Sequence, residues 1–186
     1  MMTQPIKNRH RHLPFRYVGL LMSCLLLSQQ VHSEANMHFH GALVAEPCVI
    51  PPGEENIALD FGTVIDKYLY LNQRTNGKPF VINLTQCDLS LGNVVTFAFS
   101  GIENPALTGM LALAPGSQAS GVGIGMETPE GQFLPLNKSG QAYTLLPGSN
   151  AITVHAYLQG EPEAIANEGI ERGPFSAIAT FSLEYQ

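Results

Sequence analysis

The stretch Gly173-Pro-Phe-Ser-Ala-Ile-Ala-Thr-Phe-Ser-Leu-Glu-Tyr-Gln186 closes the sequence and decides the fold we expect. From residue 177 onward every odd position is apolar or aromatic and most even positions are polar, which is the period of a half-buried β-strand. Chain ends fray unless they are held by other segments, so a terminal strand with such a clear alternating pattern needs neighbouring strands on both sides. No later segment can supply the next strand. The pattern therefore predicts a sheet with a strand missing, although it is also typical of an ordinary central or edge strand.

The opposite end predicts a secretory signal. Four basic residues precede the apolar run 17–27, and Val31-His-Ser33 places small or β-branched residues at the two positions that a signal peptidase reads. We therefore expect a signal peptide over residues 1–33, cleaved after Ser33. The apolar run is too short to span a bilayer.

The expected mature chain is acidic. It keeps all 15 acidic residues but only five of the nine basic ones, a formal net charge of −10. Such a surface repels phosphate backbones, so we expect no nucleic-acid partner. We find no nucleophile elbow, no H-E-x-x-H and no paired-acid motif, and therefore predict neither an enzyme, nor a cofactor, nor a small-molecule substrate.

Two cysteines, Cys48 and Cys87, remain after cleavage. In an exported protein such a pair forms a disulfide by default, and closing a loop of this length stabilises by roughly 4 kcal/mol in the chain-entropy model. The pair supplies too few ligands for a metal site. His38 and His40 could hold copper or zinc, but His155 is the only other mature histidine and no carboxylate cluster is nearby, so we expect no metal.

The rest of the mature chain consists of short alternating segments between Gly/Pro turns. We expect strands over residues 37–45, 57–62, 80–87, 94–100, 111–113, 121–127, 132–136, 142–146 and 151–158, with a short helix around 161–167. The glycines of 121–127 indicate a strand packed against another backbone. This pattern predicts an all-β sandwich. The absence of tryptophan excludes the antibody-type Cys-Trp-Cys core.

Several features occur together in the mature sequence. They are an alternating arm with a central glycine (Phe39-His-Gly41), a following Pro47-Cys48, a second cysteine that ends a strand (82–87) and a Ser-Gly-Val-Gly-Ile block (120–124). In addition, Gly173 is fourteenth from the end and Tyr185 is penultimate. In this combination the chain resembles the pilin subunits assembled by the bacterial chaperone–usher pathway.

The resemblance implies an incomplete immunoglobulin-like sandwich that lacks its C-terminal strand and is completed by donor-strand complementation. Residues 34–47 would be the N-terminal donor-strand extension and residues 48–186 the pilin domain. The donor residues implied are Met37, Phe39, Gly41, Leu43 and Ala45. The residues implied for the strand that borders the acceptor groove and contacts the chaperone are Gly173, Ala177, Ala179, Phe181, Leu183 and Tyr185.

The implied function is that of a structural subunit that polymerises by donor-strand exchange. A single pilin-sized domain and a composition less rich in small residues favour a minor or adaptor subunit contributing to adhesion; a major or terminating pilin is the alternative. The implied partners are a periplasmic chaperone, an outer-membrane usher and neighbouring pilins, on a route through the periplasm to the cell-surface fimbria.

A hypothesis of another class is a free-standing exported immunoglobulin-like domain. It would bind a glycan or other ligand through Tyr68, Tyr70 and Tyr143. Half-buried sheet tyrosines with satisfied hydroxyl groups explain the same residues.

Overall fold

The computed structural model describes residue 43 and residues 45–186, so the expected signal peptide lies outside the described residues. Of the arm expected to form a strand over 37–45, only Leu43 and Ala45 are described, and both are exposed. No helix in the described part of the chain is long and apolar enough to cross a membrane.

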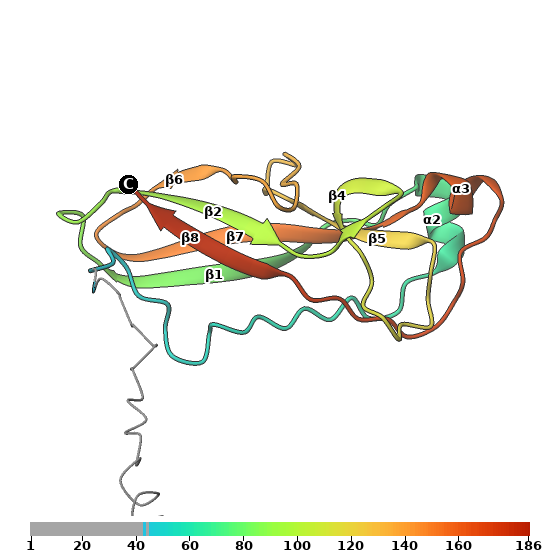
Figure 1. The fold of residues 1–186 in the computed structure, drawn as a ribbon, viewed down its shortest axis with the longest axis horizontal. Coiled ribbons are helices and arrows are strands. Elements are labelled where there is room, and N and C mark those ends of the chain that lie inside the picture. The colour runs from blue at the N-terminus through green and yellow to red at the C-terminus, as the bar shows by residue number, and fades with distance from the viewer. Residues whose placement is uncertain (1–42, 44) are drawn as a thin grey trace, which may run out of the picture. The chain divides into compact units, whose positions relative to one another are not determined.

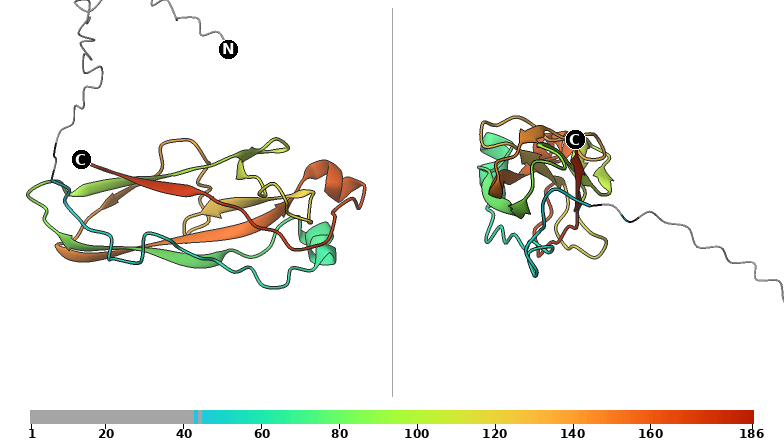
Figure 2. Two further views of the ribbon diagram at one scale, coloured as in Figure 1. Left: turned by 60° about the horizontal axis from the view of Figure 1, so that its bottom comes forward. Right: turned by 90° about the vertical axis from the view of Figure 1, so that its left-hand side faces the viewer.

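Two antiparallel sheets form the domain (Figures 1 and 2). The five-stranded sheet has the order β1 (Lys78–Cys87), β7 (Gly148–Gly160), β5 (Val122–Glu127), β4 (Leu107–Leu111) and β3 (Glu103–Asn104). The three-stranded sheet has the order β6 (Ala142–Thr144), β2 (Val94–Ser100) and β8 (Thr180–Tyr185). The helices are α2 (Asp66–Asn72) and α3 (Pro162–Ala166). The predicted all-β sandwich is confirmed.

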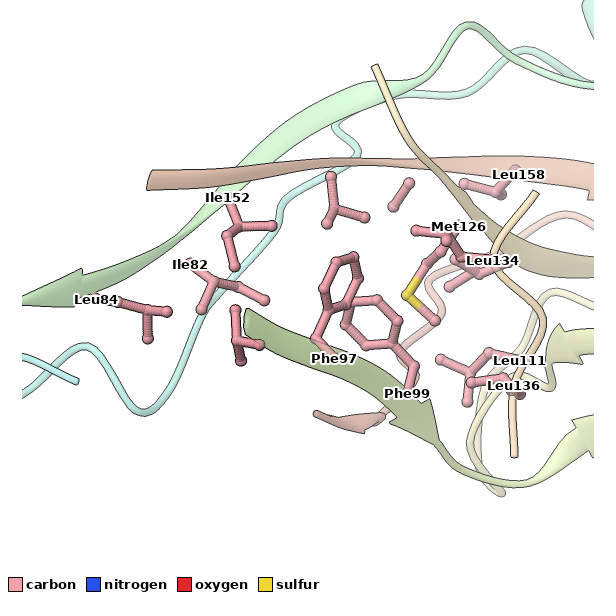
Figure 3. Close-up of a cluster of buried hydrophobic side chains, with 14 of the residues drawn as sticks. Ile82, Leu84, Phe97, Phe99, Leu111, Met126, Leu134, Leu136, Ile152 and Leu158 are labelled. Atoms are coloured by element: carbon pink, nitrogen blue, oxygen red, sulfur yellow. The ribbon is translucent and has the colours of Figure 1, made fainter. Parts of the chain in front are cut away.

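The core lies between the sheets, and strand β2 supplies its centre (Figure 3). Val95 and Phe97 are fully buried, and the Phe97 ring meets the Phe99 ring edge-on with centroids 5.6 Å apart. Strands β1 and β7 face them with Ile82 and Ile152, also buried. Alternate β2 residues therefore bury their side chains against the other sheet, as the sequence period predicts.

The glycines of β5 make room for side chains. A Cβ at Gly125 would collide with the ring of Tyr157, and one at Gly123 would lie 3.0 Å from Leu107. The Arg74 guanidinium also stacks on the Tyr157 ring, 3.5 Å from its centroid. The expectation that the glycines of 121–127 face another backbone holds for Gly121, which lies against the backbone of Gly169 and Ile170, but it was wrong for Gly123 and Gly125, which face side chains.

Two expected strands are absent as strands. Residues 57–62 make no ladder with any described segment. Residues 132–136 form a single bridge, Phe133 to Glu127. The N–H of Leu134 bonds to Met126 in β5 while that of Leu136 bonds to Gly109 in β4. This segment therefore crosses the sheet instead of running along one strand.

Other elements differ in extent. The last strand begins at Thr180 rather than at 177, β4 lies at Leu107–Leu111 rather than at 111–113, and β6 and β7 differ at their ends. The short helix α3 lies where it was expected. Helix α2 was missed because Leu69 is its only buried residue, which leaves too little apolar periodicity to detect.

The predicted disulfide between Cys48 and Cys87 is present. It ties the start of the domain to the end of β1, where Val49 and Thr85 also exchange two backbone hydrogen bonds of 2.8 Å each. Both cysteines are buried. We call this end of the sandwich the disulfide end.

Labelling of free thiols in the denatured, unreduced mature protein should find none. The double substitution Cys48→Ser, Cys87→Ser should lower the free energy of unfolding by roughly 4 kcal/mol, because the unfolded chain regains the entropy of the open loop. Denaturant titration measures the change, with the reduced wild-type protein as control. Two reactive thiols in the unreduced protein would contradict the bridge.

Candidate functional site: an open groove beside β8

A groove with a volume of about 850 Å³ opens between two segments that are far apart in sequence. One wall is residues 55–64 and the other is residues 173–181. The groove exposes part of the core, and its floor consists of Phe80, Phe99, Leu111, Ile124, Met126 and Ala156. An apolar floor between two extended walls has the shape of a position from which a strand is missing.

Strand β8 borders this groove with an open edge. Its register with β2 runs from Val95↔Tyr185 to Ser100↔Thr180, which uses one edge only. β8 is last in its sheet, and no other described strand pairs with it. The N–H and C=O groups on the open edge are therefore free to pair with an added strand.

The second wall, residues 55–64, also lacks a backbone partner among the described residues. Local contacts hold it in place: the N–H of Gly62 donates to the Asp60 carboxylate at 2.8 Å, and Lys78 Nζ donates to the Asp60 carbonyl. Phe61 leans toward the other wall, its ring centroid 6.0 Å from that of Phe175. The segment alternates like a strand but has nothing beside it to form a ladder.

The inward-facing residues of the C-terminal segment are only half-buried, although they pack against the core. They are Phe175, Ala177, Ala179, Phe181, Leu183 and Tyr185. The equivalent inward residues of the neighbouring strand β2 are buried, Phe97 completely. Burial also raises the pKa of the Tyr185 hydroxyl, and the nearby Glu46 carboxylate adds to this rise. Because these inward-facing side chains are incompletely covered, the three-stranded sheet of the sandwich is open on the side of the groove.

Gly173 stands at one end of the groove for a steric reason. A Cβ at this position would lie 2.5 Å from the Cβ of Gln118, closer than real Cβ atoms come. The Pro174 carbonyl accepts a hydrogen bond of 2.9 Å from the N–H of Gln118, which fixes this close approach. Any side chain at 173 would push the two segments apart and move the wall of the groove.

The structure brings four of the six predicted groove-strand residues onto the groove itself: Gly173, Ala177, Ala179 and Phe181. Leu183 and Tyr185 continue the same face and pack on the core beyond it. The sequence reasoning did not identify residues 55–64 as the second wall. Half-buried Leu59 and Phe61 were visible as an alternating pattern, but nothing local shows that their segment lies opposite β8.

Met37, Phe39 and Gly41 of the expected donor arm lie outside the described residues, and so do His38 and His40. Among the described residues, no group of three or more His, Cys, Asp or Glu side chains could hold a metal ion. The structure therefore leaves the donor role of the arm as a prediction.

The three tyrosines of the ligand-binding hypothesis do not converge. Tyr68 and Tyr70 belong to α2 and Tyr143 to β6, at opposite ends of the sandwich (Figure 1). The Tyr70 hydroxyl accepts a hydrogen bond of 3.1 Å from the N–H of Ile170, and the Tyr143 ring packs 5.3 Å from that of Phe97. These are structural roles.

Comparisons with known proteins agree with this geometry. The major MR/P fimbria protein of Proteus mirabilis (strain HI4320) is 31% identical over 170 residues, covering 91% of this chain and 93% of that protein. The fimbrial adapter PapK of Escherichia coli is 30% identical over 173 residues, covering 90% and 96%. The crystal structure of the P pilus rod subunit PapA has the same fold, with a TM-score of 0.65 and 24% identity over 76% of this chain and 100% of that one. Residues 37–186 match the family described as fimbrial protein, and the chain therefore belongs to this family.

Proposed function

We propose that this protein is a structural subunit of a chaperone–usher fimbria and that its groove accepts an extended strand from a neighbouring subunit. The observation that carries the proposal is the open edge of β8 beside an apolar groove of about 850 Å³. A strand added there would pair its backbone with β8 and place alternate side chains on the exposed floor. This is β-strand addition, in which main-chain bonds provide affinity and side-chain pockets provide specificity.

The energy available from the groove is large. An apolar side chain that fills a pocket on the floor contributes about 2 kcal/mol, and each net backbone hydrogen bond contributes about 1 kcal/mol. Three such side chains and several bonds along β8 would together rival the stability of a small domain. The added strand would thus be part of the fold rather than a loosely held ligand.

Residues 34–47 are the segment we propose as the donated strand. Met37, Phe39 and Leu43 would share one face of this strand and enter the floor of a neighbour's groove. Gly41 lies between them and would meet the narrowest part of the groove, where a side chain would not fit. The arm leads directly into buried Pro47 and the disulfide, so it is joined closely to the folded domain.

An open edge beside exposed core is an aggregation hazard, which is the physical reason for a chaperone. In the proposed pathway a periplasmic chaperone first lends a strand, an outer-membrane usher receives the complex, and the arm of the next subunit then replaces the chaperone. The mature protein would end in a cell-surface fimbria, after the signal peptide over residues 1–33 has been removed.

Within the fibre we propose a minor, adaptor-like position. The support is the composition and the likeness to the adapter PapK. The likeness to a major fimbrial protein is of the same size, so a shaft position is the competing assignment. Immunogold labelling of whole fimbriae distinguishes the two, because an adaptor is found at few sites and a shaft subunit along the entire fibre.

The substitution Phe181→Asp should abolish co-purification with the chaperone. It places a charge on the half-buried face that lines the groove, which costs several kcal/mol in the absence of a partner. The matched control is Ser182→Asp, one residue along the same strand but exposed on the opposite face. A chaperone complex of Phe181→Asp recovered at the wild-type yield would refute the role of this face.

Deletion of residues 36–45 should separate donating a strand from accepting one. It removes the apolar residues of the arm but leaves the disulfide, the groove and every described strand in place. The deleted subunit should still form a chaperone complex and accept another subunit's arm, but should not insert into a neighbour. Loss of chaperone binding would mean that the arm is an internal strand of a complete sandwich.

A finer test of the arm is Gly41→Asn, which adds one side chain where the backbone must come close. Folding on the chaperone should be unchanged while assembly into fimbriae is blocked. Conversely, a synthetic peptide of residues 34–46 should stabilise a chaperone-free pilin of the same fibre, measured by thermal unfolding, and the same peptide with Asn at position 41 should not. Normal polymerisation of Gly41→Asn would contradict the proposal.

A further inference from the structure

Helix α2 carries an exposed apolar face. Ile65 at its N-cap is 63% exposed, Tyr68 is 41% exposed and Leu71 is 84% exposed. A spacing of three residues places them along one side of the helix. Leu69 is the only buried residue of the helix, so its large apolar side chains lie mostly toward solvent. Large apolar side chains gathered on one exposed surface are typical of a protein–protein contact.

This face lies at one end of the groove. The wall 55–64 leads directly into α2, whose Asp66 carboxylate accepts a hydrogen bond of 2.8 Å from Nε of Arg172. Arg172 directly precedes Gly173, where the other wall begins. This ion pair holds the pKa of Asp66 below its usual value. Both walls of the groove therefore meet at α2.

The opposite end of β8 lies where the chain's own arm leaves the domain. The Gln186 carbonyl accepts a hydrogen bond of 3.0 Å from the N–H of Asn93. A Cβ at Gly92 would lie 3.1 Å from both the Gln186 carbonyl oxygen and Pro47, so these segments converge. β8 thus runs from the α2 end to the disulfide end (Figures 1 and 2).

The direction of an added strand decides where the donor's domain must sit. Antiparallel pairing with β8 is the more stable arrangement. Because β8 runs from the α2 end to the disulfide end, an antiparallel added strand has its C-terminal end at α2. The alternating part of an arm like this chain's, residues 37–45, spans about 30 Å when extended, and so does the nine-residue groove wall 173–181. Only Glu46 and Pro47 then separate the inserted residues from the first cysteine, Cys48. The disulfide end of the donor would then come directly against α2.

We propose that the exposed face of α2, formed by Ile65, Tyr68 and Leu71, is the docking surface for the disulfide end of the fimbrial subunit whose arm fills the groove. The inference rests on the proposed function. This chain's own disulfide end shows the kind of surface that docks, with exposed Val49 beside Cys48 and exposed Leu91 and Leu146 in the adjoining turns. The arm holds the two surfaces at a high effective concentration, so a small apolar contact is sufficient.

Site-specific photo-cross-linking in cells that assemble the fimbria tests this contact. The photoreactive residue p-benzoylphenylalanine replaces Leu71 in one variant, Ile178 in a second and Val81 in a third. Ile178 is 81% exposed and lines the groove, so it reports whether an arm is inserted. Val81 is 40% exposed in the middle of β1 and is the control for random contact. Mass spectrometry identifies the cross-linked peptides.

We expect position 178 to capture the N-terminal arm of a fimbrial subunit. Position 71 should capture the same subunit near its first cysteine or in the adjoining turns, and position 81 should not. If position 178 captures an arm while position 71 captures nothing from that subunit's domain, the docking surface is wrong and the proposed function stands. If position 178 captures no arm in assembled fimbriae, both are overturned.

A second measurement tests whether a change at position 71 acts only on the contact and leaves the fold of the subunit intact. Leu71→Ser in a chain that carries the reporter at position 178 should leave capture of the arm in place, because the Leu71 side chain is exposed and does not line the groove. A fourth variant carries p-benzoylphenylalanine in place of Tyr68 and should cross-link to the donor's domain. Adding Leu71→Ser to this variant should cause loss of that cross-link. An unchanged cross-link from position 68 would overturn the role of Leu71 in the contact.

Discussion

The one-sided pairing of β8 with β2 is the constraint on which the rest of the structure depends. β2 carries the centre of the core, and β8 continues its sheet by only one strand. The next position in the sheet is the groove, so a row of backbone groups and a stripe of apolar side chains remain without cover. The domain therefore lacks one strand beside β8. A strand that a neighbour adds at this position completes the fold and at the same time joins the two subunits.

Contacts at both ends of the groove connect its walls to the rest of the domain. At the α2 end, the Asp66–Arg172 ion pair and the packing of Gly173 against Gln118 set the distance between the two walls. At the disulfide end, the cystine and the bond from Asn93 to the Gln186 carbonyl hold the chain termini of the domain. Between these anchors the wall 55–64 makes no backbone ladder, whereas the wall 173–181 is bonded through Pro174 and Ser176 to the segment 114–119.

The five-stranded sheet is the larger of the two layers. Its β5–β7 ladder is reinforced by Arg74, which makes two hydrogen bonds to the buried Glu127 carboxylate of β5 and stacks on Tyr157 of β7. A bidentate pair of this geometry, with one partner 7% exposed, holds its neighbours more firmly than an ordinary surface ion pair. This sheet supplies most of the groove floor, and Phe99 of β2 supplies the rest.

Features that depend on local period and on the small number of cysteines could be predicted from the sequence. The alternation in 94–100 and after residue 177 predicted β2 and the inward face of β8, and two mature cysteines could form only one intramolecular bridge. Tertiary structure alone decided that residues 57–62, which alternate equally well, form no ladder, and that they lie opposite β8. A strand pattern fixes which side chains face inward, but a ladder needs a partner within hydrogen-bonding distance, and that partner is set by contacts far apart in sequence. Helix α2 was not predicted either, because its single buried leucine gives no apolar period to detect. The end of the groove where the two walls meet was therefore not predicted.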